Sequence, residues 1–172
     1  RTLFERMMGP ADRSAPSPAV SLETLRGEIL ADDELLLDYY FGDERVLLFA
    51  VSAGATRVVE LAPADHLEPR LKLYRDLLAA PPPATPVEMA GRRALLAASA
   101  AELHGELLAP ISELLLRPKH LLYSPDGPLN GIPLQLLLEG DSDEGLLVSR
   151  LPSATILARL RNGGTRDPAL IE

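Results

Sequence analysis

The residues best suited to chemistry in this chain lie in one loop, between Pro125 and Pro133. The loop follows a short apolar strand predicted at residues 121–123, and its prolines fix the backbone while its glycines allow conformations that other residues avoid. In α/β domains, a structured loop at the carboxyl end of a strand commonly contacts ligands. We therefore take as candidate binding residues, forming the wall of a substrate cleft, Asp126, Gly127, Asn130 and Gly131.

Asp126 is the acidic residue of this loop, and two roles are open to it. Its carboxylate could line a pocket for a basic side chain, or it could accept hydrogen bonds from the backbone of its own loop. Asp-Gly is common turn chemistry, so the sequence favours the structural role.

Other candidate sites are weaker. The histidines at positions 66, 104 and 120 share no ligand-like spacing with one another or with an acid, so we predict no metal site and no cofactor. Ser124, a histidine and Asp126 supply the residue types of a hydrolase triad, but no G-x-S-x-G elbow is present, and turn roles are preferred. The acidic run at residues 139–145 lacks the length and closing glutamate of an EF-hand, and it is read as a solvated connection.

Composition excludes several classes of function. The 172 residues include no cysteine, so the chain has no disulfide, thiolate metal ligand or thiol nucleophile of its own. A net charge of −8 argues against nucleic acid as a partner, because phosphate binding needs clustered cations. No apolar run approaches the roughly 18 residues of a membrane span, and no signal peptide opens the chain. We expect no membrane partner and a cytoplasmic location.

Three strands are predicted in the first half. Residues 9–20 have the composition of a linker, and Ser21 is a suitable N-cap for a short helix with Leu22, Leu25 and Ile29 on one side. Apolar segments at residues 35–41, 45–51 and 56–61 are separated by short turns. Segments joined in this way form an antiparallel meander.

Helices and strands then alternate. A first helix, with apolar positions from Leu67 to Leu78, ends at the prolines 81–83, and a capping box from Thr85 to Glu88 begins a second that Pro110 should kink or divide. Further segments follow: a strand at 120–123, a helix at 134–138, a strand at 146–150 and a helix at 153–161. Alternation implies parallel pairing through right-handed crossovers. The predicted fold is α/β, with an antiparallel amino-terminal meander, the first strands of a mainly parallel sheet, and flanking helices.

The order of these segments resembles a known family, the CHAT domain, a caspase-like cysteine peptidase domain often attached to tetratricopeptide repeats. Residues 119–134 resemble its strand–PDGxLxGxP–helix unit, residues 103–111 are similar to its helix with an LLxPL-like stretch, and residues 147–157 look like its second strand, which ends in PSAT. Two positions differ: Asn130 stands where the family often has His, and Leu134 where it often has Phe.

The resemblance implies a division of the chain and a role for it. Residues 1–20 would be a linker or the tail of a preceding region, and residues 21–172 the amino-terminal portion of a CHAT domain. In the family the catalytic His follows the third strand, which would begin at Asp167, and the catalytic Cys follows the fourth, so both would lie beyond Glu172. The implied function is the scaffold and cleft wall of a cysteine endopeptidase, inactive alone. Protein or peptide substrates, and a tetratricopeptide-repeat region of the same protein, would be its partners.

Two other functions stay open. One is a regulatory or scaffolding module that binds other proteins without catalysis, and the weaker one is an unrelated α/β domain that binds a nucleotide or small molecule. A sheet that ends after its second parallel strand exposes an unpaired edge, so we also expect self-association or pairing with a partner strand.

Overall fold

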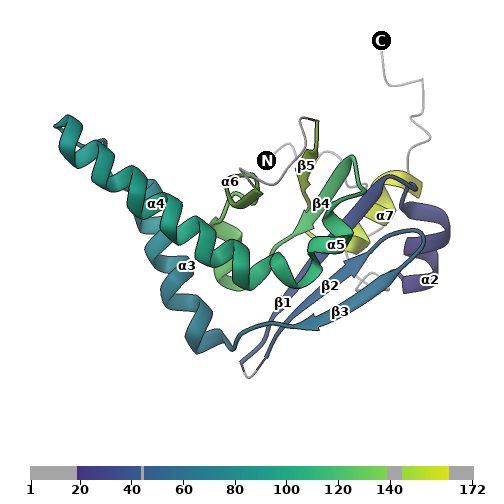
Figure 1. The fold of residues 1–172 in the computed structure, drawn as a ribbon. Coiled ribbons are helices and arrows are strands. Elements are labelled where there is room, and N and C mark those ends of the chain that lie inside the picture. The colour runs from purple at the N-terminus through teal and green to yellow at the C-terminus, as the bar shows by residue number, and fades with distance from the viewer. Residues whose placement is uncertain (1–18, 44, 139–144, 163–172) are drawn as a thin grey trace, which may run out of the picture.

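A five-stranded mixed sheet forms the centre of the molecule (Figure 1). The computed structural model describes residues 19–43, 45–138 and 145–162. The strand order across the sheet is β3-β2-β1-β4-β5. The bounds of the strands are β1 Glu34–Phe41, β2 Val46–Val51, β3 Thr56–Glu60, β4 His120–Ser124 and β5 Leu147–Arg150.

The pairing confirms the α/β class and the meander. Strand β2 pairs antiparallel with β1 and with β3, whereas β4 pairs parallel with β1 and with β5. The described sheet is therefore evenly mixed, and the expected predominance of parallel pairing is not seen in it. Short turns after β1 and β2 permit only antiparallel neighbours, while the long helical connection before β4 returns the chain in the same direction as β1.

Helices cover both faces of this sheet (Figure 1). One face packs against α3 (Ala64–Ala79), α4 (Pro86–Leu107) and the short segments η2 (Ala109–Ile111), α5 (Ser112–Leu115) and α6 (Gln135–Leu138). The other packs against η1 (Leu25–Ile29), which continues α2 (Leu22–Thr24), and α7 (Ala154–Asn162). Side chains alternate along β1: Leu35, Leu37 and Tyr39 enter the first core, and Leu36 the second.

Local signals end and join the helices where the sequence predicts. The Thr85 hydroxyl accepts a hydrogen bond from the Glu88 amide at 3.3 Å, and the Glu88 carboxylate accepts one from the Thr85 amide at 3.2 Å. The predicted second helix ends at Leu107 and gives way to η2, which contains Pro110, as that proline requires. The Arg92 guanidinium donates to the Leu77 and Ala80 carbonyls and so closes the α3–α4 hairpin, which projects beyond the sheet (Figure 1).

The apolar face predicted for the short helix after Ser21 is wrong at one of its three positions. Leu25 and Ile29 are buried as predicted, but Leu22 is 47% exposed. The cause is a π-helical turn from Leu25 to Ile29, in which the Leu30 amide donates to the Leu25 carbonyl. The wider turn changes the angular spacing of the side chains, so a face extrapolated at the α-helical period does not stay on one side. The strand predicted to begin at Asp167 lies outside the described residues.

Strand β5 is one edge of the described sheet, and Leu147 on it is 66% exposed. If copies of the chain associate through this edge, Leu147→Lys should weaken the association, because a charge on an edge strand opposes pairing. The change is measured by light scattering over a range of protein concentrations. Leu160→Lys on α7, where the leucine is 60% exposed, is the matched control. A wild-type chain that stays monomeric at high concentration would contradict the expectation.

Candidate functional site

The Asp126 carboxylate attaches the loop after β4 to the end of β1. Its Oδ1 accepts a hydrogen bond from the Gly127 amide at 2.8 Å, and its Oδ2 accepts one from the Phe41 amide at 2.9 Å. The first contact is the turn role that the sequence favours, and the second is a long-range bond that the sequence does not reveal. Both oxygens already accept hydrogen bonds from backbone amides, so a basic substrate would compete with these bonds. Contact between Asp126 and such a substrate stays a prediction.

The two candidate glycines differ in backbone conformation and in what a side chain at each would meet. Gly127 has a φ of +52°, and a Cβ there would lie 3.1 Å from the Cβ of Phe41. It thus combines a left-handed backbone with close approach to β1. Gly131 does not need the special conformation expected of it. A Cβ at Gly131 would lie 2.8 Å from Cδ of Arg75, which belongs to a flexible side chain.

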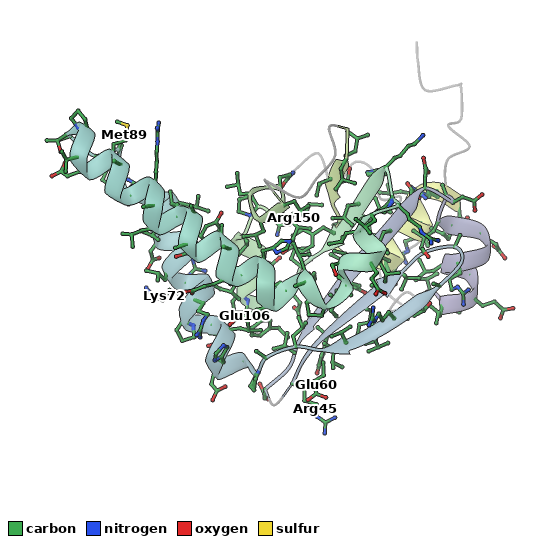
Figure 2. The ribbon with its side chains drawn as sticks, viewed as in Figure 1. Arg45, Glu60, Lys72, Met89, Glu106 and Arg150 are labelled. Atoms are coloured by element: carbon green, nitrogen blue, oxygen red, sulfur yellow. The ribbon has the colours of Figure 1, made fainter. Side chains whose placement is uncertain are left out.

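Asn130 connects the loop to the end of β5. Its Nδ2 donates to the Gly127 carbonyl at 3.1 Å, and its Oδ1 accepts from Nη2 of Arg150 at 2.8 Å. Arg150, labelled in Figure 2, is the last residue of β5. Arg150 is not among the residues predicted from the sequence, although a charged residue at the carboxyl end of a neighbouring strand is a usable signal for this edge of the sheet.

Tyr123 on β4 binds the loop through its hydroxyl. Its hydroxyl donates to the Leu129 carbonyl at 3.2 Å, and its ring meets that of Tyr39 edge to face, with 5.7 Å between centroids. Burial raises the pKa of both tyrosines, so they remain neutral donors. With the bonds from Asp126 and Asn130, the loop is attached to β1, β4 and β5.

A cavity of about 300 Å³ opens beside this loop at the carboxyl ends of β4 and β5. Of the predicted residues, Asn130 and Gly131 line it, whereas Asp126 and Gly127 support the loop without lining it. The other lining residues include Tyr123, Ile132, Pro133, Val148 and Arg150. The structure therefore brings part of the predicted cleft wall together with a cation.

A second carboxylate, Asp38, lies at the same edge of the sheet. It stands opposite Ser124 in the parallel β1–β4 register. Burial raises the pKa of Asp38, the hydrogen bond from Ser124 opposes that shift, and the nearby Asp126 charge adds to it. Ser124 is buried and its hydroxyl bonds a carboxylate rather than a histidine, so it is not arranged as a triad nucleophile.

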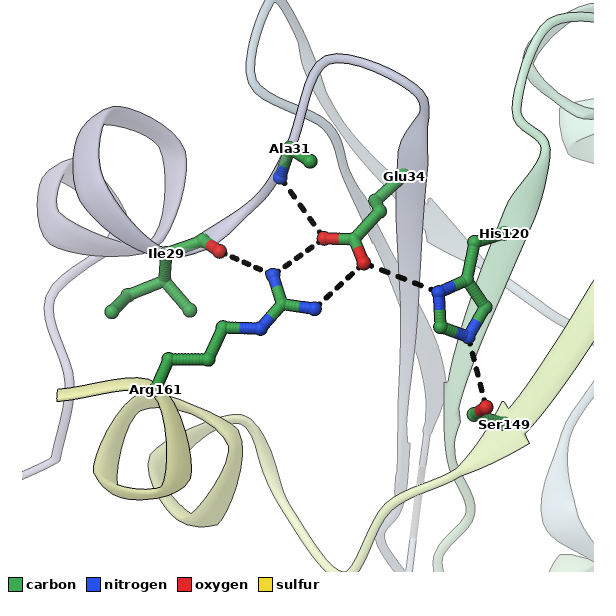
Figure 3. A network of polar contacts seen from close by, with 6 residues as sticks. All are labelled: Ile29, Ala31, Glu34, His120, Ser149 and Arg161. Carbon is green, nitrogen blue, oxygen red and sulfur yellow. Dashed lines mark hydrogen bonds and ion pairs between the residues drawn. The ribbon is translucent and has the colours of Figure 1, made fainter. Parts of the chain in front are cut away.

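Glu34 is the centre of a polar network at the opposite, amino-terminal edge of β1 and β4 (Figure 3). Its carboxylate is 2.6 Å from Nη2 and 2.5 Å from Nη1 of Arg161 on α7, and it accepts from the Ala31 amide at 2.9 Å. His120 Nδ1 lies 3.2 Å from the same carboxylate, and its Nε2 lies 2.8 Å from Oγ of Ser149. Arg161 also donates to the Ile29 carbonyl.

This network has the residue types of a Ser–His–Glu triad, but its geometry is that of a structural cluster that joins neighbouring elements. Glu34 is buried and paired through both oxygens with Arg161, so its charge is already neutralised before it can orient or stabilise an imidazolium. Ser149 lies within the β4–β5 ladder rather than on an exposed turn. We interpret the cluster as the connection that fastens η1 and α7 to β1 and β4.

Metal ligation has no support in the part of the chain that the structure describes, where no group of three or more His, Cys, Asp or Glu side chains comes together. His66 instead lies 2.8 Å from Glu106 and links α3 to α4. Within the same residues, no helix is both long and apolar enough to span a bilayer.

Gly127→Ala should lower the free energy of unfolding by about 1–3 kcal/mol, because the new Cβ adds strain to a left-handed residue pressed against Phe41. Gly131→Ala is the matched control and should cost less, since Arg75 can move. Urea denaturation of the two variants measures the difference. Equal losses would contradict the anchoring role assigned to Gly127.

Glu34→Gln should destabilise the fold at neutral pH by an amount on the order of 3 kcal/mol. The hydrogen bond from Arg161 is the main cause that lowers the pKa of Glu34 from 4.5 to about 2. The folded state therefore favours the ionised carboxyl, so this stability is present above about pH 4.5 and is lost as the pH falls toward 2. Urea denaturation from pH 7 to pH 2.5 should show the difference between Glu34→Gln and wild type shrinking. Glu113→Gln, at an 87% exposed side chain, should show almost no difference at any pH.

Comparisons with known proteins identify no relative of this chain. No protein family, no curated protein and no solved structure matches the chain. Function is therefore inferred from the contacts described above and from the sequence resemblance.

Proposed function

We propose that residues 21–172 form the amino-terminal scaffold and one substrate-cleft wall of a CHAT-type, caspase-like cysteine endopeptidase. The observation that carries the proposal is the loop between Pro125 and Pro133. It is bonded to β1 through Asp126, to its own strand β4 through Tyr123, and to β5 through Asn130. A wall held at three points is fixed before a substrate arrives, which lowers the entropic cost of binding.

The position of the loop supports the same role. Ligands of open α/β sheets bind outside the carboxyl ends of parallel strands, and the loop and its cavity lie at that edge of β4 and β5. The parallel strands β1, β4 and β5 would be the first of the peptidase sheet. The proposal includes protein or peptide substrates and a cytoplasmic location.

The chemistry would require residues from outside this sequence. In a Cys–His peptidase the imidazole assists a thiolate, which attacks the peptide carbonyl. The chain has no cysteine, so its own contribution is to bind and orient the substrate beside a dyad supplied elsewhere. On its own, it should hydrolyse no peptide by a thiol mechanism.

The alternative is a non-catalytic interaction module, and one observation favours it. A largely apolar groove of about 600 Å³ lies between α3, α4 and α6, with Tyr74, Leu78, Leu96 and Leu136 among its lining residues. On α4, Val87 in the first turn is 82% exposed, and Leu95, next to Leu96 in the sequence, is 59% exposed. An exposed apolar helix surface is typical of a protein-binding face. A tetratricopeptide-repeat region of the same protein would be a suitable partner for it.

The proposal is tested on the full-length product of the gene and on the 172-residue chain in parallel. A thiol-directed activity probe should label the full-length protein at a cysteine outside these residues, and fluorogenic peptides should be cleaved by it and not by the chain. Asn130→Ala in the full-length protein should reduce cleavage several-fold and leave probe labelling intact, because the wall is affected and the nucleophile is not. A full-length protein that no thiol probe labels would refute the peptidase and favour the interaction module.

A further inference from the structure

The guanidinium of Arg150 gives the cavity beside the loop a positive charge. Arg150 is exposed, lines the cavity, and donates from Nη2 to Oδ1 of Asn130 at 2.8 Å. This acceptor is a neutral amide. Three other arginines in the described residues are placed against carboxylates: Arg161 on Glu34, Arg70 on Glu106 and Arg45 on Glu60. The contact with Asn130 therefore positions Arg150 without neutralising it.

A series of hydrogen bonds fixes the position of that charge. Asn130 is itself held by the Gly127 carbonyl at 3.1 Å, and Gly127 donates to Asp126 at 2.8 Å. Asp126 in turn accepts from the Phe41 amide on β1. The orientation of the Asn130 amide follows from this series, because its NH₂ group faces one carbonyl and its oxygen faces a guanidinium. The position of the Arg150 guanidinium at the cavity is thus fixed relative to β1, the central strand of the sheet.

We propose that this cavity binds a peptide carboxylate, carried by an acidic side chain, on the Arg150 guanidinium. The inference rests on the proposed function, for which it names the substrate class. Guanidinium is planar and matches a carboxylate with two parallel hydrogen bonds, while Asn130 occupies another of its donors. Pro133, Ile132 and Val148 supply apolar contact for the rest of the side chain.

The same geometry argues against a basic ligand. Asp126, the acid of the loop, is absent from the cavity lining and has both oxygens bonded to backbone amides. A lysine or arginine entering the cavity would meet Arg150 and no carboxylate from the loop. The overall charge of −8 repels acidic peptides at long range, so selection for them depends on this local cation.

The test measures binding rather than cleavage, so that it is independent of the peptidase. Uniformly ¹⁵N-labelled 172-residue chain is titrated with acetyl-Ala-Asp-Ala-amide, with its Asn counterpart, and with acetyl-Ala-Asn-Ala bearing a free carboxyl terminus. Two-dimensional NMR follows the Arg150 Nε–H and the Asn130 side-chain amide. The Asp peptide should shift both resonances with an affinity about fivefold above that of the Asn amide, the size expected for an exposed ion pair.

Two test variants and one control variant complete the experiment. Arg150→Gln should remove the preference for the Asp peptide, while Arg93→Gln, an exposed arginine on α4, should leave it unchanged. Asn130→Asp should also remove it, because a carboxylate beside Arg150 would occupy the guanidinium from within the chain. The spectra themselves report whether each variant remains folded.

Equal binding of the Asp and Asn amides, or an Asp preference that survives Arg150→Gln, would overturn the inference. Binding of the free carboxyl terminus without binding of the Asp amide would assign the site to peptide ends and overturn the side-chain assignment. Selective Asp binding in a protein whose full-length form resists thiol probes would refute the peptidase and keep the acidic site. Labelling of the full-length protein by the thiol probe without selective Asp binding would keep the peptidase and refute the acidic site.

Discussion

The fold depends on the burial of strand β1 between two cores. Leu35, Leu37 and Tyr39 enter one core and Leu36 enters the other, while the strand pairs antiparallel with β2 on one side and parallel with β4 on the other. Strand order and register elsewhere follow from this element, because a slip of one residue would exchange its two faces. The strand also has a different polar partner at each end: Glu34 binds Arg161 of α7, and the Phe41 amide binds Asp126 of the loop.

These two ends make the sheet asymmetric. At the amino edge, the Glu34 carboxylate is saturated by a bidentate guanidinium, a backbone amide and an imidazole, so the polar groups there serve one another. At the carboxyl edge, each oxygen of Asp126 accepts a hydrogen bond from a backbone amide, and Arg150 is held by a neutral partner beside a cavity. The contrast agrees with the general placement of ligand sites in open α/β sheets and separates the stabilising cluster from the candidate binding cluster.

The local features of this fold were readable from the sequence, and the long-range ones were not. Thr85 with Glu88, and Pro110, mark helix boundaries through interactions within a few residues, so their effects were predicted. The left-handed Gly127 agrees with the expectation for the loop glycines, whereas Gly131 has no positive φ, and the atom nearest to a Cβ there belongs to Arg75, 56 positions away. The pairing of Glu34 with Arg161 and of Arg150 with Asn130 joins residues from separate elements. No periodicity or local motif specifies which charged side chains will meet across such a distance.

The unequal lengths of β1 and β4 have a consequence for how related sequences could diverge. Strand β1 runs from Glu34 to Phe41, but β4 pairs with it only as far as Asp38, so the last three residues of β1 extend beyond their parallel neighbour. The loop after β4 folds back over that extension and binds the Phe41 amide. The eight residues from Glu34 to Phe41 therefore set the distance between the polar contacts at the two ends of the sheet. Insertions should accumulate at the tip of the α3–α4 hairpin and be excluded from these eight positions.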